Sequence, residues 1–219
     1  MTTRRQAERK RPAPRLYLVT QRNDDAGTLA RPLEAALAAA DIAAVLLRLG
    51  GADERSLIKQ VKAIAPVIQE RGVALLLDGH AEIVAGAGAD GAHLCGCDAL
   101  KQALPGLKPD RIAGAGGLQT RHDAMLAGEA GADYVMFGEP AGNGERPPFP
   151  AVAERVAWWS EVFEVPCVGF AASIDEAEAL ARAGAEFVAL GDFIWRDPCG
   201  PASATAAAAQ RLAALEPAR

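Results

Sequence analysis

The feature that most constrains the fold of this 219-residue chain is a repeat of eight short apolar segments, each followed by a longer helical segment. Short apolar runs bounded by turn residues predict buried strands, and the amphipathic or alanine-rich stretches between them predict helices. The predicted strands are 16–20, 43–47, 73–77, 91–94, 111–114, 134–137, 167–170 and 187–190. The predicted helices are 28–40, 54–71, 81–87, 99–104, 120–130, 152–163, 174–183 and 202–215. Eight βα units in order favour an α/β fold of the (β/α)8 TIM-barrel type, with eight parallel strands, over an open doubly wound sheet, which connectivity alone does not exclude.

Glycine stands at several of the predicted joints between a helix and the next strand. These glycines are Gly72, Gly88, Gly131 and Gly184. Glycine adopts the left-handed backbone conformation that commonly ends a helix, because it has no Cβ atom. The sequence therefore predicts that the preceding helices end at these positions.

The length fits one barrel domain, which we place at residues 15–219, because complete barrels begin at about 200 residues. Residues 1–14 are rich in Arg and Lys and contain no apolar run, so they predict a disordered basic arm rather than a signal peptide or a membrane span. Such an arm can touch nucleic acid or an acidic membrane, but the net charge of −5 and the absence of a folded basic surface argue against both partners. We expect a cytoplasmic protein.

The cysteines form no CxxC pair and are expected to be reduced thiols. They are Cys95, Cys97, Cys167 and Cys199. Because Cys95, Cys97 and His80 follow neighbouring predicted strands, they are also candidates for a soft-metal site such as zinc, with Asp78 or Asp98 as a fourth ligand. Buried cysteines are, however, common as simple packing residues, and that interpretation stays open.

Polar residues that follow the predicted strands are the candidates for a functional site, because barrel enzymes carry their chemistry at the carboxyl ends of the strands. We take as candidate ligand-binding residues Arg48, Asp78, His80, Gln119, Glu139, Arg146 and Asp192, and as a candidate metal ligand Asp98.

Two of these residues allow two interpretations, and a nearby histidine is expected to have a structural role. Arg48 either holds an anion or pairs with a nearby carboxylate such as Asp78. Asp98 is either a metal ligand or an ordinary helix N-cap. His93 lies inside a predicted strand and is expected to be a buried, hydrogen-bonded packing residue.

Three carboxylates, Asp78, Glu139 and Asp192, follow different predicted strands and are expected to meet at one mouth of the barrel. A mouth lined by negative charge favours a cationic or neutral ligand over a phosphorylated one.

Four segments of the chain resemble thiamine phosphate synthase and its relatives the thiazole tautomerases, in the same order and at matching spacings. They are residues 16–20 (LYLVT), 88–94 (GADGAHL), 131–138 (GADYVMFG) and 184–186 (GAE). The resemblance implies a TIM barrel that joins a hydroxymethylpyrimidine diphosphate to a thiazole phosphate and releases pyrophosphate with Mg²⁺ as cofactor. Such chemistry needs hard oxygen ligands for the metal and many donors for the phosphate oxygens.

The chain keeps few of the family's site residues in its first half. Of the family's Gln-x-Arg-x-Lys after the second strand, only the arginine is present, as Arg48. The family's Asn-Asp-Arg falls on residues 78–80 (DGH), where a shift of one residue would let Asp78 replace the metal ligand. The resemblance implies that Asp98 is the second metal carboxylate.

The second half departs further. The family's Ser-x-His falls on residues 116–118 (GGL), and its Thr-x-Thr-Lys on residues 141–146, where Arg146 stands in approximately for the lysine. Its phosphate-binding Gly-Gly-Ile falls on residues 171–173 (AAS), and a phosphate-facing serine becomes Asp192. The site is therefore degraded relative to the family pattern.

Three functions remain open. The first is a thiamine phosphate synthase-type transferase. The second is a non-catalytic paralogue that binds a non-phosphorylated small molecule. The third is a thiazole tautomerase, but this chain has Leu118 at the position where the imidazole for that reaction is expected. All three imply a small-molecule ligand, and barrels of this family often pair, so a homodimer is possible.

Overall fold

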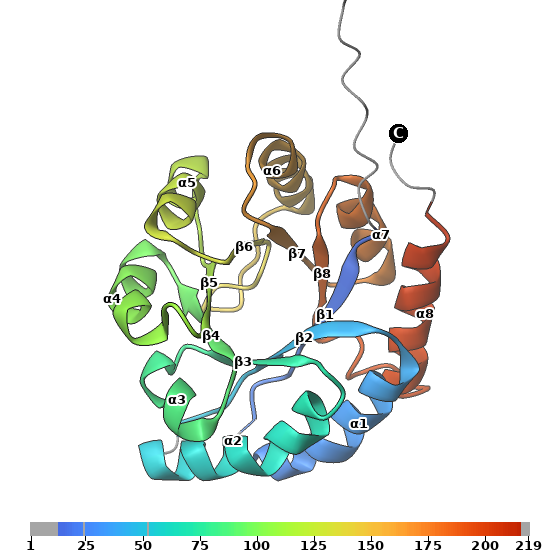
Figure 1. Cartoon of the computed structure of the whole chain (residues 1–219). Helices are drawn as coiled ribbons and strands as arrows, with labels where there is room; N and C mark the ends of the chain where they lie inside the picture. The colour runs from blue at the N-terminus through green and yellow to red at the C-terminus, as the bar shows by residue number, and fades with distance from the viewer. Residues whose placement is uncertain (1–12, 24, 52, 216–219) are drawn as a thin grey trace, which may run out of the picture.

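The computed structural model describes residues 13–23, 25–51 and 53–215, and its strands form a closed eight-stranded barrel (Figure 1). The strands are β1 (Arg15–Val19), β2 (Ile42–Leu47), β3 (Ala74–Asp78), β4 (Gly91–Cys95), β5 (Ile112–Gly116), β6 (Tyr134–Phe137), β7 (Cys167–Ala171) and β8 (Phe187–Leu190). Each strand pairs in parallel with the next, and β8 closes the barrel against β1. The predicted (β/α)8 barrel is confirmed, and every predicted strand overlaps an observed one.

The helices surround the barrel, and one or more follow each strand (Figure 1). They are η1 (Ala26–Leu29), α1 (Ala30–Ala39), α2 (Glu54–Gln69), η2 (Ala81–Ile83), α3 (Val84–Ala87), α4 (Cys97–Leu107), α5 (Arg121–Ala130), α6 (Phe149–Val162), α7 (Ile174–Arg182) and α8 (Pro201–Ala213). The predicted third helix divides into η2 and α3, and the predicted fourth helix is longer than expected. Apart from Ala13 and Pro14, the predicted basic arm lies outside the described residues.

Glycine adopts the left-handed conformation at all four predicted joints and is the C-cap of two of the helices, whereas Glu70 caps α2 and Ala183 caps α7. Gly88 and Gly131 are the left-handed C-caps of α3 and α5, with φ of 76° and 104°. Gly72 and Gly184, at the joints before β3 and β8, have φ of 71° and 100°. At its other end α5 begins with a capping box, in which the Thr120 hydroxyl and the Asp123 carboxylate each accept a backbone hydrogen bond.

The core has two parts because each strand points alternate side chains to opposite faces of the sheet. The larger part lies between the strands and the helices, and Trp159 of α6 is its largest fully buried side chain. The smaller part fills the barrel interior and is made of Tyr17, Val19, Ala44, Leu46, Leu76, Tyr134, Met136, Val168, Phe170 and Ala189. The barrel is therefore packed below its mouth, and a ligand can enter only from an end.

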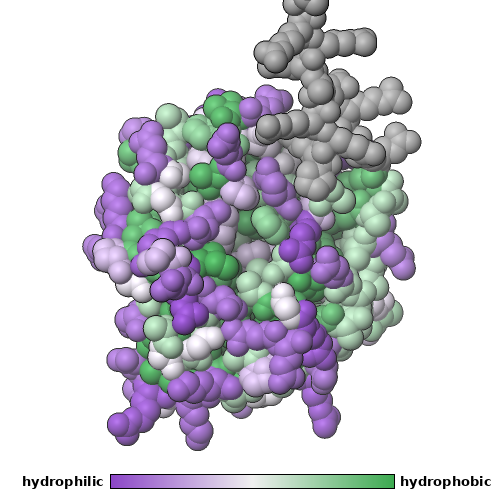
Figure 2. All heavy atoms as spheres, viewed as in Figure 1, coloured by the Kyte–Doolittle hydropathy of each residue, from purple (hydrophilic) through white to green (hydrophobic). Residues whose placement is uncertain are grey.

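Polar and charged side chains cover much of the face seen in Figure 2, and a paler apolar band runs over alanine-rich α8. Among the described residues, no helix combines the length and the apolar character that a membrane span requires.

Candidate active site at the mouth of the barrel

A cavity of about 480 Å³ opens at the carboxyl ends of the strands. It is lined by Val19, Arg22, Leu46, Arg48, Asp78, His93, Cys95, Gly117, Leu118, Gln119, Met136, Gly138, Glu139, Pro140, Ala141, Gly142, Glu145, Arg146, Pro147 and Phe170. The volume falls within the range of small-molecule binding sites. Enzymes with a (β/α)8 barrel hold their active sites at this end of the barrel.

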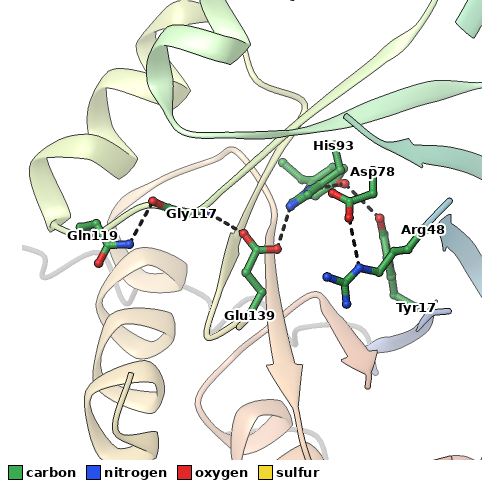
Figure 3. Close-up of polar contacts among 8 residues, drawn as sticks. Tyr17, Arg48, Asp78, His93, Gly117, Gln119 and Glu139 are labelled. Atoms are coloured by element: carbon green, nitrogen blue, oxygen red, sulfur yellow. Dashed lines mark hydrogen bonds and ion pairs between the residues drawn. The ribbon is translucent and has the colours of Figure 1, made fainter. Parts of the chain in front are cut away.

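Arg48 and Asp78 form an ion pair on one side of the cavity (Figure 3). The Arg48 Nε donates to Asp78 Oδ2 at 3.1 Å, and the two side chains are 27% and 30% exposed. The Arg48 backbone N–H donates to the buried Thr20 hydroxyl at 2.9 Å, which fixes the end of β2 against the end of β1. The pairing interpretation of Arg48 is thus confirmed. Its two terminal nitrogens form no hydrogen bond within the described chain and remain available to a ligand.

Glu139 and His93 form a second pair, next to the first, because His93 on β4 is the register partner of Asp78 on β3. His93 Nε2 lies 2.9 Å from Glu139 Oε2, and the backbone N–H of Gly117 donates to Glu139 Oε1 (Figure 3). The predicted burial and hydrogen bonding of His93 are confirmed, since its side chain is 2% exposed, but one edge of the ring also lines the cavity.

Burial and charge act in opposite directions on this pair. Burial alone would lower the pKa of His93, but the charge and hydrogen bond of Glu139, with a contribution from Asp78, raise it above its usual 6.5. Burial would raise the pKa of Glu139, but His93, the Gly117 N–H and Arg48 lower it below its usual 4.5. Glu139 is therefore ionised at neutral pH.

A chain of hydrogen bonds continues from His93 into the barrel. His93 Nδ1 lies 2.9 Å from the Tyr134 hydroxyl, which lies 3.0 Å from the Tyr17 hydroxyl. Burial raises the pKa of both tyrosines, so both hydroxyls keep their protons. When His93 is neutral, Tyr17 donates to Tyr134, Tyr134 donates to His93, and His93 donates to Glu139. Each donor in this chain of hydrogen bonds then has an acceptor.

Two glycines on the inner face of β5 make room for this polar chain. A Cβ atom added at Gly114 would lie 2.0 Å from Tyr134 Cζ, and one added at Gly116 would lie 2.0 Å from Glu139 Oε1. Contacts this short force neighbouring atoms to move, so larger residues at these positions are incompatible with the observed arrangement.

Arg146 lines the cavity, but most of its donors are used within the chain. Its Nε donates to the Gly138 carbonyl at 3.0 Å, and its Nη2 donates to the Phe170 carbonyl at 3.2 Å and to Glu176 at 3.0 Å. Its guanidinium also lies 5.3 Å from the Phe170 ring centroid. Arg146 therefore ties the loop after β6 to β7 and α7 in addition to facing the cavity. Gln119 lines the cavity as well, with Nε2 at 3.4 Å from the Gly117 carbonyl.

Other candidates from the sequence do not line the cavity. Asp98 is exposed on the first turn of α4, and Gly96, not Asp98, is the N-cap. His80 lies outside the cavity with its ring 3.4 Å from Glu82. Asp192 pairs with Arg196 at 3.0 Å and is absent from the lining, so only Asp78 and Glu139 of the expected acidic mouth face the cavity.

The cysteines do not assemble a metal site. Strand β4 ends at Cys95, and Cys97 begins α4, where its thiol donates to the Asp123 carbonyl at 3.2 Å. The two sulfurs therefore do not share a strand face. Burial, with the charges of Glu139 and Asp78, raises the pKa of Cys95, which keeps the thiol protonated at neutral pH. In the part of the chain that the structure describes, no three His, Cys, Asp or Glu residues gather in a metal-binding cluster.

The role of His93 in the site was not predicted, although the sequence contains the signal. His93 and Cys95 are two positions apart on a strand, so a strand that points Cys95 into the mouth also points His93 inward. Its partner Glu139 lies on the loop after β6, two strands further along the barrel, and sequence spacing does not pair the two residues.

Replacing Asp78 by Asn is expected to tighten the binding of inorganic pyrophosphate about fivefold, because the paired carboxylate that competes for Arg48 is removed. Isothermal titration calorimetry measures the change. Asp41→Asn removes a carboxylate whose side chain is 83% exposed and lies outside the cavity, and it serves as the control. Unchanged or weaker binding by Asp78→Asn would show that Arg48 does not contact anions.

A closed barrel of eight parallel strands with a polar cavity at their carboxyl ends defines the (β/α)8-barrel structural class. Within that class, the profile of the family described as thiamine monophosphate synthase matches residues 16–194. This chain therefore belongs to the thiamine monophosphate synthase family.

Individual relatives agree with this assignment. The thiamine-phosphate synthase of Rhodospirillum centenum is 40% identical over 196 residues, which cover 88% of this chain and 94% of that protein. The thiamine-phosphate synthase of Hyphomonas neptunium is 38% identical over 206 residues, covering 90% and 93%. Among solved structures, thiamine phosphate pyrophosphorylase from Pyrococcus furiosus superimposes with a TM-score of 0.72 at 19% identity, covering 91% of this chain and 95% of that one. At that identity the superposition supports the fold alone.

Proposed function

We propose that the protein acts in thiamine biosynthesis as a thiamine-phosphate synthase, transferring hydroxymethylpyrimidine from its diphosphate to thiazole phosphate and releasing pyrophosphate. The observation that carries the proposal is the extent of the similarity, since two thiamine-phosphate synthases at 40% and 38% identity align over 94% and 93% of their own lengths. The cavity at the barrel mouth is the place where this reaction would occur. A cytoplasmic location is part of the proposal and is supported by Cys95, Cys97 and Cys199, which form no disulfide within the described residues.

In this proposal, Arg48 and Arg22 hold the anionic groups of the substrates. Both line the cavity, and the hydrogen bond of Arg48 to Asp78 uses Nε rather than the terminal nitrogens. A diphosphate carries more charge than one carboxylate and competes with Asp78 for the guanidinium. The apolar side chains of Leu46, Met136 and Phe170 line the same cavity and would pack against the heterocyclic rings.

The Mg²⁺ ion that the family reaction uses does not fit the residues present. Magnesium binds through carboxylates together with substrate phosphates. Asp98 is exposed outside the cavity, Asp78 is bound by Arg48, and the described residues hold no cluster of three potential ligands. We therefore assign no step to the metal.

A second candidate function is the binding of a non-phosphorylated small molecule without turnover. The observation that favours it is the charge of the cavity, whose three arginines are balanced by the carboxylates of Asp78, Glu139 and Glu145. Arg48 pairs with one of these, and Arg146 pairs with Glu176 behind the cavity wall. Thiazole tautomerase is the weakest candidate, because the apolar Leu118 lines the cavity where an imidazole is expected.

Pyrophosphate release separates the two main candidates. Purified protein is incubated with hydroxymethylpyrimidine diphosphate and thiazole phosphate, with and without added Mg²⁺, and released pyrophosphate is measured over time. The synthase proposal expects multiple turnovers, reduced at least tenfold by Arg48→Met, which removes the charge at similar length. The same change at exposed Arg196, outside the cavity, is the control. Absence of release, with no binding heat for either substrate, would reject the synthase proposal.

A further inference from the structure

The carboxylate of Glu139 has free capacity to accept hydrogen bonds on the side that faces the cavity. A carboxylate offers about four lone-pair positions. One position on each oxygen of Glu139 is used, by the Gly117 N–H and by His93 Nε2. The side chain is 18% exposed and lines the cavity, so the remaining positions are open to a ligand.

The groups behind Glu139 supply no donor of their own to a ligand. With neutral His93, the protons of Tyr17, Tyr134 and His93 are all directed along the chain toward Glu139. Both ring nitrogens of His93 are engaged, which fixes the ring and, through it, the carboxylate. This wall of the cavity thus presents a negatively charged hydrogen-bond acceptor, the Glu139 carboxylate, held in one orientation.

Gly116 is the residue that permits this arrangement. A Cβ atom at position 116 would lie 2.0 Å from Glu139 Oε1 and 2.3 Å from His93 Nε2. A larger residue at position 116 would therefore displace Glu139 or His93.

The rest of the cavity limits the shape of the ligand. Leu46, Met136 and Phe170 line it with apolar surface, and Met136 and Phe170 belong to the packed interior of the barrel. An acceptor beside apolar walls suits a flat ring that carries a hydrogen-bond donor on its edge.

We propose that Glu139 is a specificity-determining residue that recognises an amino group or a protonated ring nitrogen of a planar heterocycle, and that Gly116 makes this recognition possible. The inference deepens the proposed function and rests on it for the choice of heterocycle, which is the aminopyrimidine end of the diphosphate substrate. It requires no phosphate on the ligand, since Glu139 would repel one.

Calorimetric titration of the full chain with two unphosphorylated probes tests the proposal. The probes are 4-amino-5-hydroxymethyl-2-methylpyrimidine and the same compound without its amino group. Wild-type protein is expected to bind the amino compound at least tenfold more tightly, because a hydrogen bond to an ionised group is stronger than a neutral one. Glu139→Gln, which keeps the shape and replaces the charge, is expected to remove this preference. Gly116→Ala is expected to remove it by displacing Glu139.

The control is Glu161→Gln, an exposed position on α6 outside the cavity, where the preference is expected to persist. Circular dichroism confirms that each variant is folded. Equal binding of the two probes by wild-type protein, binding of neither, or a preference that survives Glu139→Gln would overturn the inference.

Parallel measurement of pyrophosphate release separates this inference from the synthase proposal. Amino preference that depends on Glu139, in a protein that releases no pyrophosphate, would support the inference and reject the synthase activity. Pyrophosphate release by a protein with no amino preference would do the reverse.

Discussion

Replacing His93 by Leu is expected to lower the free energy of unfolding by about 3 kcal/mol at pH 6, because it leaves the carboxylate of Glu139 in a mostly buried position without its partner. Leucine fills a volume close to that of the imidazole, so the loss comes chiefly from the broken pair rather than from a cavity. Urea denaturation followed by tryptophan fluorescence gives the difference. His122→Leu, at an exposed position on α5, is the control.

The pH dependence of this loss has a definite sign. In the wild type the lowered pKa of Glu139 gives stability that is present above its usual 4.5 and is lost as the pH falls through the lowered value. The raised pKa of His93 gives stability that is complete below its usual 6.5 and is lost as the pH rises through the raised value. The difference between wild type and His93→Leu is therefore expected to be largest between about pH 5 and 6.5 and to shrink near pH 4.

A second substitution separates the broken pair from lost packing. In the His93→Leu background, Glu139→Gln removes the unpaired charge and is expected to restore more than half of the lost stability. If Glu139→Gln restores nothing, or if the loss is the same at pH 4 and pH 6, the stabilising role of the pair is wrong.

The barrel could be predicted because its signals are local. Each strand is a short apolar run, and glycines such as Gly88 and Gly131 mark the helix ends through a backbone conformation that other residues avoid. The predicted helix boundaries differ from the observed ones where the local signals are weak. The segment predicted as one helix, 81–87, divides into η2 and α3. The helix predicted to begin at residue 99 begins at Cys97, which the sequence left open as part of the preceding strand.

The site could be predicted only in part, because its contacts join strands that are far apart in the sequence. The Arg48–Asp78 pair was one of two interpretations, since neighbouring strand ends bring those residues together. The pairing of His93 with Glu139 depends on the space that Gly116 leaves, because glycine has no side chain there. Sequence patterns for acid–base or metal sites specify which side chains are present, so they do not predict a pair that depends on a glycine. Asp192 was expected at the mouth, but it pairs with Arg196 four residues later and does not line the cavity.

Truncating Trp159 to Ala is expected to cost about 3 to 5 kcal/mol of unfolding free energy, because the ring is fully buried and its removal leaves a large cavity. The indole Nε1 donates to the Val165 carbonyl at 2.6 Å, and the ring stacks on Phe163 with centroids 4.0 Å apart. These contacts join α6 to the segment that leads into β7. Thermal unfolding followed by circular dichroism should show a fall in Tm of about 10 °C for a chain of this length.

The neighbouring Trp158 offers a matched control on the same helix. It is half-buried, with the Arg121 guanidinium 4.8 Å from its ring centroid, so Trp158→Ala is expected to cost about 1 kcal/mol. Equal losses for the two variants would contradict the assignment of Trp159 as the anchor of α6. The loop that carries Glu139 and Arg146 runs from β6 into α6. Trp159→Ala should therefore also weaken the preference of the cavity for the probe that carries an amino group, whereas Trp158→Ala should leave that preference intact.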